Sequence, residues 1–204
     1  MLVIGLTGSI GMGKSAVAAM MRERGIAVFD ADAEVHRLYE GPAVSAIEKA
    51  FPGSSEYGRV NRQLLARQLA GDPEKFKALE AIVHPLVERA EREFLKSEAA
   101  RGAKLAVLEI PLLFETGRDR MVDVTLVVSA PRDVQRKRVL ERPGMTAEKL
   151  EQLLLRQMSD EEKRRRADYV VDTGGSLVET EAQLAHIIEG LMHRECKAFK
   201  RHWL

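Results

Sequence analysis

Short apolar runs alternate along the chain with longer amphipathic stretches. The runs Leu2–Leu6, Ile26–Phe29, Leu105–Ile110, Val122–Val128 and Tyr169–Val171 are apolar at successive positions rather than at every second one. Strands of this kind are typical of a parallel sheet that is covered on both faces. The sequence therefore predicts a five-stranded parallel sheet.

The stretches between these runs have helical spacing. Helices are predicted over Lys14–Arg24, Arg132–Arg142, Thr146–Met158 and Leu177–Met192. Gly25 follows the first of them, in the position of a C-cap glycine. Strands interleaved with helices predict an α/β fold of three layers.

The middle of the chain is mostly helical in its pattern. Asn61–Ala70 and Pro73–Ala100 are rich in Ala, Leu, Glu, Arg and Lys, and Pro52–Ser55 separates them from what precedes as a loop. We expect a single domain over 1–204, in which an insertion at about 33–101 forms a helical substrate lobe.

Composition narrows the class of protein. The 204 residues include 32 basic and 31 acidic side chains, a net charge of +1, which argues against a dedicated nucleic-acid binder. No apolar run is long enough to span a membrane, and no positively charged leader is expected. The single cysteine, Cys196, cannot form an internal disulfide. We expect a cytoplasmic protein, with the monomer favoured, whose basic end Lys197–Trp203 is frayed.

A glycine-rich segment joins the first predicted strand to the first predicted helix. It reads Gly8-x-x-x-x-Gly13-Lys14-Ser15 and matches the Walker A pattern, or P-loop, in full. Glycines let successive N–H groups surround phosphate oxygens, and the helix N-terminus adds partial positive charge. Lys14 reaches the β- and γ-phosphates as a catalytic cation, and the Ser15 hydroxyl coordinates Mg²⁺. The residues expected to hold ATP here are Gly8, Gly11, Met12, Gly13, Lys14, Ser15 and Ala16.

A P-loop alone fits a kinase, a GTPase switch or a motor ATPase. The chain has no Asn-Lys-x-Asp or Thr-Lys-x-Asp segment for guanine selection, which disfavours a GTPase. It is also too short for the accessory domains of motor ATPases. A small-molecule kinase fits best.

Two aspartates follow the second predicted strand. Asp30 and Asp32 lie past its carboxyl end, the edge at which open α/β sheets bind their ligands. A kinase that acts on an alcohol needs a carboxylate to orient the hydroxyl and take its proton. The alternative is that Asp32 only caps the helix that follows. Position alone leaves both readings open.

Several segments together resemble the dephospho-coenzyme A kinase family. They are Thr7–Ser15, Gly25–Asp32, Ala81–Pro85, Glu109–Glu115, Arg156–Met158 and Lys163–Asp168, in the family's order over most of the chain. The resemblance implies transfer of phosphate from ATP to the ribose 3′-hydroxyl of dephospho-coenzyme A, the last step of coenzyme A synthesis. It implies Asp32 as the base and Asp30 as its support.

The chain departs from this family at a few positions. The family usually has Gly at Ser9, Ser at Met12 and Thr at Ala16, but the glycine, lysine and hydroxyl positions needed for chemistry are kept. After the last strand the family often has Asn where this chain has Thr173. That difference weakens any transfer of adenine contacts to this loop.

Four further side chains are candidates for the site. Glu109 ends a strand, where it supports Mg²⁺, contacts substrate or is merely structural. The resemblance favours substrate contact for His84 over a packing role. In related kinases a mobile lid, here about 142–166, brings arginines to the phosphates, so Arg142 is a catalytic candidate and Arg156 a nucleotide-binding one. The alternative is a solvated helical hairpin, and Arg164–Arg166 is expected to be a solvated face.

Two other functions compete with this interpretation. One is another P-loop kinase, for a nucleotide, shikimate or a sugar acid, which would share the loop and differ in the substrate lobe. The other is a nucleotide-binding regulatory protein without turnover of a small molecule. The acidic pair and the arginines of the lid argue against the second, because a pure binder needs no base facing an acceptor.

Overall fold

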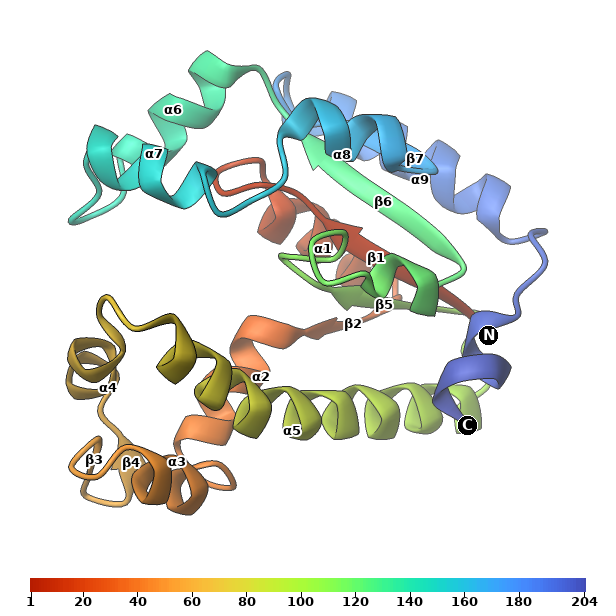
Figure 1. Ribbon diagram of the computed structural model, residues 1–204. Coiled ribbons are helices and arrows are strands. Elements are labelled where there is room, and N and C mark those ends of the chain that lie inside the picture. The colour runs from red at the N-terminus through yellow and green to blue at the C-terminus, as the bar shows by residue number, and fades with distance from the viewer. The chain divides into compact units, whose positions relative to one another are not determined.

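The computed structural model describes residues 1–204 and is built on a five-stranded sheet in the order β2-β5-β1-β6-β7 (Figure 1). β1 pairs in parallel with β5 on one side and with β6 on the other, and β6 pairs in parallel with β7. The predicted five-stranded parallel sheet is confirmed. The strands are β1 (Leu2–Thr7), β2 (Ala27–Asp30), β5 (Leu105–Glu109), β6 (Val124–Ser129) and β7 (Tyr169–Asp172).

The chain forms two compact units. The first comprises residues 1–29 and 95–204 and contains the sheet, and the second comprises residues 30–94. The second unit covers most of the segment 33–101 that the sequence marks as an insertion. That the whole chain acts as one domain stays a prediction.

The first unit packs helices on the sheet. Alternate residues of β1, Leu2, Ile4 and Leu6, share a buried cluster with Val17 of the first helix and Leu184 of the last. The sheet therefore buries this face under α1 and α9, as the continuous apolar strands require. The helical elements of this unit are α1 (Lys14–Glu23), η1 (Arg118–Met121), α6 (Arg132–Leu140), α7 (Ala147–Leu154), α8 (Asp160–Arg166), α9 (Leu177–Leu191) and η2 (Phe199–Trp203).

The predicted helix Thr146–Met158 is shorter in the structure. The Thr146 side chain accepts the N–H of Lys149 and starts α7, which ends at Leu154. The Ser159 side chain accepts the N–H of Glu162 and starts α8. The predicted helix therefore ends at Leu154 rather than at Met158, and the cap at Ser159 starts a separate helix, because its hydroxyl satisfies a free N–H of the first turn.

The second unit is mostly helical, as predicted. A small hairpin, missed in the sequence because each strand has two residues, turns at Tyr57 and Gly58, whose φ angles are 51° and 75°. Positive φ at both central residues is the geometry of a tight hairpin turn. The elements are α2 (Ala31–Tyr39), α3 (Val44–Ala50), β3 (Ser55–Glu56), β4 (Arg59–Val60), α4 (Arg62–Leu69) and α5 (Pro73–Ala100), whose last residues belong to the first unit.

The carboxyl end of the chain is folded, so the expectation of a frayed tail is wrong. Trp203 is 1% exposed, and its indole N–H donates to the carbonyl oxygen of Met121 at 2.8 Å. The carboxylate of Asp123 accepts the N–H groups of Lys197 and Ala198 at 2.6 and 2.8 Å. Burial of the Trp203 ring with its N–H hydrogen-bonded stabilises this end of the chain, while the basic side chains around it remain in water.

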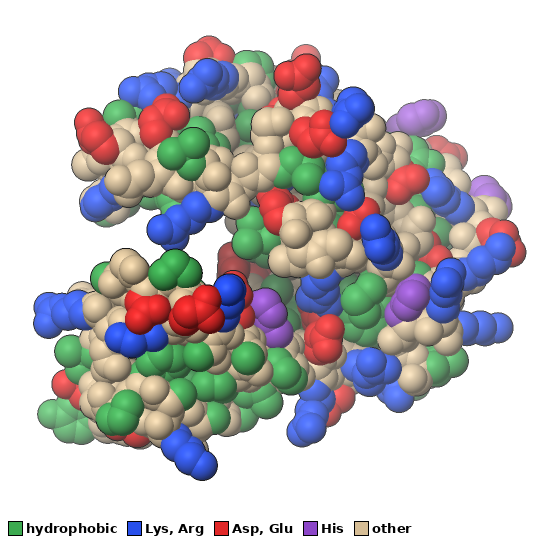
Figure 2. Space-filling model, viewed as in Figure 1, with side chains coloured by type: hydrophobic (Ala, Val, Ile, Leu, Met, Phe, Trp, Pro, Cys, Tyr) green, Lys and Arg blue, Asp and Glu red, His purple; other side chains and the backbone are tan.

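The surface carries charges of both signs. On the face drawn in Figure 2, Lys and Arg side chains are interspersed with Asp and Glu, and no continuous basic area covers it. None of the helices combines the length and the apolar character needed to cross a membrane.

Candidate active site

The P-loop connects β1 to α1 in the first unit. β1 ends at Thr7 and α1 begins at Lys14, and between them Gly11 and Gly13 have φ angles of 78° and 88°. Residues with a side chain rarely adopt this left-handed backbone region, so both turns depend on glycine. The Gly13 turn leaves the first N–H groups of α1 at the end of the loop, where a helix favours an anion.

Close packing also restricts the loop to glycine. A Cβ atom on Gly8 would lie 2.4 Å from Cγ2 of Val128, and one on Gly11 would lie 2.5 Å from Cγ2 of Val139. A Cβ atom on Gly13 would lie 3.0 Å from Oγ1 of Thr173. The backbone thus lies directly against β6, α6 and the segment after β7, and a side chain at any of the three positions would force it away.

Lys14 and Glu109 lie together at the carboxyl edge of the sheet. Lys14 Nζ is 4.0 Å from Glu109 Oε1, and their side chains are 17% and 9% exposed. Glu109 reaches this place because it ends β5 in register with Leu6, next to the start of the P-loop. Lys14 and Glu109, which the sequence suggested as two separate candidates, therefore form one charge pair at the N-terminus of α1.

The oxygen ligands near this pair suit Mg²⁺. Ser15 is exposed in the first turn of α1, and the Glu109 carboxylate is a second hard oxygen donor in the same unit. No group of three His, Cys, Asp or Glu side chains in the chain forms a cluster that could hold a metal alone. Mg²⁺ characteristically uses one or two protein oxygens together with phosphates and water. The residues present fit an ion of that kind.

Two glutamines hold the tip of the P-loop. Gln157 Oε1 accepts the backbone N–H of Ile10 at 3.2 Å, and Gln135 Nε2 donates to the carbonyl oxygen of Ile10 at 2.8 Å. Gln135 lies on α6 and is 4% exposed, whereas Gln157 lies between α7 and α8. The backbone N–H and C=O groups of Ile10 are therefore both held by side chains that are distant in sequence.

The segment that carries Gln157 is itself anchored. Oε1 of Glu115 accepts the N–H of Met158 at 2.8 Å and lies 2.9 Å from Nζ of Lys163, which is fully buried. This distance defines an ion pair, although its angles are poor for a hydrogen bond. A buried ammonium requires such a partner, so Glu115 ties the base of α8 to the loop after β5.

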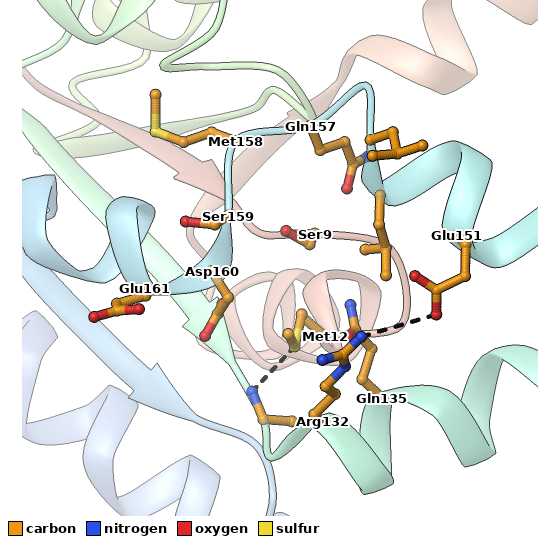
Figure 3. Close-up of a pocket in the computed structure, with 13 residues that line it drawn as sticks. Ser9, Met12, Arg132, Gln135, Glu151, Gln157, Met158, Ser159, Asp160 and Glu161 are labelled. Atoms are coloured by element: carbon orange, nitrogen blue, oxygen red, sulfur yellow. Dashed lines mark hydrogen bonds and ion pairs between the residues drawn. The ribbon is translucent and has the colours of Figure 1, made fainter.

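A cavity of about 460 Å³ lies beside the P-loop in the first unit (Figure 3). Residues of the P-loop, of α6 and of the segment 151–161 line it. Figure 3 shows Ser9, Met12, Gln135, Gln157 and Asp160 around the space, with the sulfur of Met12 accepting the N–H of Ala130 at 3.1 Å. Segment 151–161 falls within the predicted lid, so that part of the chain forms a wall next to the nucleotide loop.

Thr173 contacts the P-loop directly. Its hydroxyl donates to the carbonyl oxygen of Met12 at 2.8 Å, and Arg138 donates to its carbonyl and hydroxyl oxygens at 2.6 and 3.2 Å. Met12 itself is buried and its N–H donates to Ser9. Thr173, which stands where the family often has Asn, therefore holds the P-loop through its hydroxyl group.

The predicted lid arginines are exposed. Arg142 follows α6 and Arg156 follows α7, and neither guanidinium forms a hydrogen bond or an ion pair. Arg156 directly precedes Gln157, so it lies next in the chain to a residue that contacts the P-loop. The run Arg164–Arg166 is exposed, as predicted. Within it, Arg166 also lies 4.8 Å over the ring of Phe114 and 3.1 Å from Asp119.

The second unit carries the remaining candidates. The Asp30 side chain accepts the N–H of Ala33 at 2.9 Å and caps α2, so the cap reading of Asp32 is wrong. Asp32 is exposed in the first turn of that helix. His84 is exposed on α5 beside Pro85, and no polar contact joins it to Asp32.

Sequence reasoning gave no role to Gln135, Gln157 or Arg138, which together hold the P-loop and the segment after β7. One signal was present for Gln135, since it is a polar residue between apolar positions of an amphipathic helix. The contacts of the other two link residues more than 30 positions apart, which periodicity does not encode.

The comparisons with known proteins agree with this geometry. A family model described as dephospho-CoA kinase matches residues 2–179. The chain is 53% identical over 198 residues to the dephospho-CoA kinase of Brucella abortus (strain 2308), covering 97% of this chain and 99% of that protein. It is 56% identical over 197 residues to that of Rhizobium etli, covering 97% of each. The crystal structure of TT1252 from Thermus thermophilus superposes with a TM-score of 0.81 at 39% identity, over 93% of this chain and 96% of that one. The chain belongs to the dephospho-CoA kinase family.

Proposed function

We propose that this chain transfers the γ-phosphoryl group of ATP to the ribose 3′-hydroxyl of dephospho-coenzyme A and releases coenzyme A and ADP. One observation carries the proposal: 53% identity to a dephospho-CoA kinase extends over 97% of the chain. Such coverage includes the P-loop unit and also the second unit, residues 30–94, where the acceptor residues are expected. A P-loop kinase for another acceptor would share the first unit and differ in the second.

The first unit binds the donor in this proposal. The family uses ATP as phosphate donor, and the positive φ angles of Gly11 and Gly13 let the loop turn backbone N–H groups toward its phosphates. The Lys14 ammonium stabilises the negative charge that develops between the β- and γ-phosphates during transfer. Ser15 would hold Mg²⁺, with Glu109 supporting the ion or its water, and the ion would neutralise phosphate charge.

The second unit supplies the base. Asp32 lies in the first turn of α2, and Asp30 fixes that turn by capping it. The Asp32 carboxylate orients the 3′-hydroxyl and takes its proton as the new P–O bond forms and the bond to the β-phosphate oxygen breaks. His84 contacts the acceptor in this proposal.

The lid arginines complete the site. Arg142 and Arg156 are cations without a partner in this structure, so no ion pair must break before they reach an anion. In the proposal Arg142 stabilises the transferring group and Arg156 binds the nucleotide. Both are adjacent to helix ends, which is where a moving segment carries its hinges.

ADP release, measured with Mg-ATP in the presence and absence of dephospho-coenzyme A, tests the proposal. We expect ADP only with the acceptor, and a product heavier by one phosphate. Release with shikimate, a sugar acid or a nucleotide instead would identify a different P-loop kinase. ATP binding without release with any acceptor would identify a regulatory protein. Removal of Mg²⁺ by EDTA is expected to abolish release, and added MgCl₂ to restore it.

The same proposal includes the cellular setting. We propose a cytoplasmic enzyme that acts as a monomer on a small molecule, because its proposed donor, ATP, is a cytoplasmic metabolite. Light scattering of the purified protein tests the monomer, for which a mass near 22.8 kDa is expected.

A further inference from the structure

A second polar group lies one helical turn from Asp32 in the second unit. His36 is four residues further along α2, so the two side chains point from the same face of the helix. Arg62, the first residue of α4, has its Nη1 atom 3.0 Å from Nε2 of His36. Asn61 caps α4 by accepting the N–H groups of Gln63 and Leu64, which fixes the position from which Arg62 extends.

The contact leaves the charge of Arg62 uncompensated. A guanidinium only donates, so Nε2 of His36 must accept, and the imidazole proton then resides on Nδ1 of a neutral ring. No carboxylate pairs with Arg62, whereas Arg37 pairs with Glu34 and Arg59 lies 3.5 Å from Glu40. Arg62 thus presents its remaining N–H donors and a full positive charge at an exposed position.

A tyrosine adjoins the same cation. Burial raises the pKa of Tyr39, and the positive charge of Arg62 acts in the opposite direction, which places the guanidinium near the phenol. Tyr39 is the last residue of α2. The two side chains that interact with the guanidinium, those of His36 and Tyr39, therefore leave it without a carboxylate partner.

We propose that Arg62, held by His36, binds the diphosphate of dephospho-coenzyme A while Asp32 acts on its 3′-hydroxyl. This inference rests on the proposed function. The acceptor hydroxyl and the 5′-diphosphate belong to one ribose, so a site for this substrate needs an anion-binding group about one sugar away from its base. Asp32 and His36 are separated by about 6 Å along the axis of α2, which is on the order of one sugar ring, and Arg62 is held at His36. Guanidinium groups form paired hydrogen bonds with phosphate oxygens, and Arg62 has donors left for them.

The inference assigns acceptor selection to the second unit. Dephospho-coenzyme A differs from a plain nucleoside in carrying a diphosphate, and a cation at this position would bind the acceptor that carries it more tightly. Its contribution falls with salt, because Arg62 is exposed and its charge is screened.

Steady-state kinetics of Arg62→Gln test the inference, with Arg59→Gln as the matched control. Both changes remove one exposed arginine charge from the same unit, but Arg59 pairs with Glu40, whereas Arg62 contacts His36. For Arg62→Gln we expect the KM for dephospho-coenzyme A to rise about tenfold, as for one lost charge-assisted contact. The KM for ATP stays within about twofold, and Arg59→Gln stays near the wild type in both constants.

The dependence of the KM for dephospho-coenzyme A on KCl separates binding from folding. We expect a shallower dependence in Arg62→Gln, since one phosphate contact is lost, and a partial return of affinity in Arg62→Lys, which restores the charge. An unchanged KM for dephospho-coenzyme A in Arg62→Gln, or an equal rise in both KM values, would overturn the inference. If the wild type fails to phosphorylate dephospho-coenzyme A at all, the proposed function fails instead.

Discussion

The side-chain oxygen of Gln157 accepts the backbone N–H of Ile10 at 3.2 Å, and so joins the segment between α7 and α8 to the tip of the P-loop. Gln135 on α6 binds the carbonyl oxygen of the same residue. The shape of the nucleotide loop therefore depends on two residues outside the Walker A motif, one of which lies in the predicted lid.

Gln157→Leu removes one of these two contacts. We expect the KM for ATP to rise about five- to tenfold, because a lost neutral hydrogen bond costs about 1 kcal/mol. The KM for dephospho-coenzyme A changes less. Gln152→Leu is the matched control, since Gln152 is an exposed residue of the neighbouring helix α7. An equal rise of the KM for ATP in both variants would show that the contact of Gln157 with the P-loop does not contribute to ATP binding.

Asp32→Asn keeps the shape of the side chain and removes the proposed base. We expect kcat to fall about 10²- to 10⁴-fold, with an unchanged dissociation constant for ATP. Asp30→Asn is the control, because an asparagine still caps α2. Turnover near that of the wild type in Asp32→Asn would exclude Asp32 as the base.

Lys14→Met removes the cation that lies 4.0 Å from Glu109. We expect kcat to fall at least about 100-fold, since the charge that develops on the phosphates loses its partner. Lys137→Met, on the exposed face of α6, controls for the loss of one positive charge. A full rate in Lys14→Met would contradict the assignment of the loop.

The sequence pattern predicted the sheet and the P-loop because both are local signals. Buried parallel strands are recognised by continuous apolar runs, and glycine spacing is recognised because the backbone needs positive φ at Gly11 and Gly13. The carboxyl end was misread, since basic residues around Trp203 are typical of a tail. Its burial depends on Met121 and Asp123, which are remote in sequence.

The same limit applies to the candidate site. The acidic pair at the end of β2 was predicted from its place in the chain, and of the two readings left open for Asp32 the helix cap is wrong, because Asp30 caps α2. A helix start read from sequence commonly shifts by one or two residues, because several neighbouring side chains can cap. The contact of Arg62 with His36 joins two helices, and no single periodic pattern contains both residues.

Trp203→Ala is expected to lower the free energy of unfolding by about 3 kcal/mol, because a fully buried aromatic side chain is lost. Urea unfolding followed by circular dichroism measures the change, since the variant lacks the only tryptophan of the chain. Trp203→Phe is the control and retains most of the apolar contact while losing the hydrogen bond to Met121. A loss below about 0.5 kcal/mol in Trp203→Ala would show that the end of the chain contributes nothing.

Asp168 links stability to pH. Burial alone raises the pKa of Asp168, but the N–H and hydroxyl of Thr125 and the guanidinium of Arg194 favour the carboxylate, and the net result is a lowered pKa. A carboxyl group with a lowered pKa stabilises the fold above its unfolded pKa, and this stability is lost as pH falls below about 4. Asp168→Asn is therefore expected to show a smaller loss of urea midpoint between about pH 7 and pH 3. Asp133→Asn, at an exposed site on α6, should follow the wild type.

The order of the strands has a consequence for how the protein is made. β1 is synthesised first, yet it is the central strand: Leu2 pairs with Leu105 and Ile4 with Val124. During translation the P-loop strand must wait, without either neighbour, until the whole second unit has emerged. The second unit is continuous in sequence over residues 30–94 and has no such requirement. On the ribosome, therefore, the second unit can form before the sheet that carries the P-loop exists.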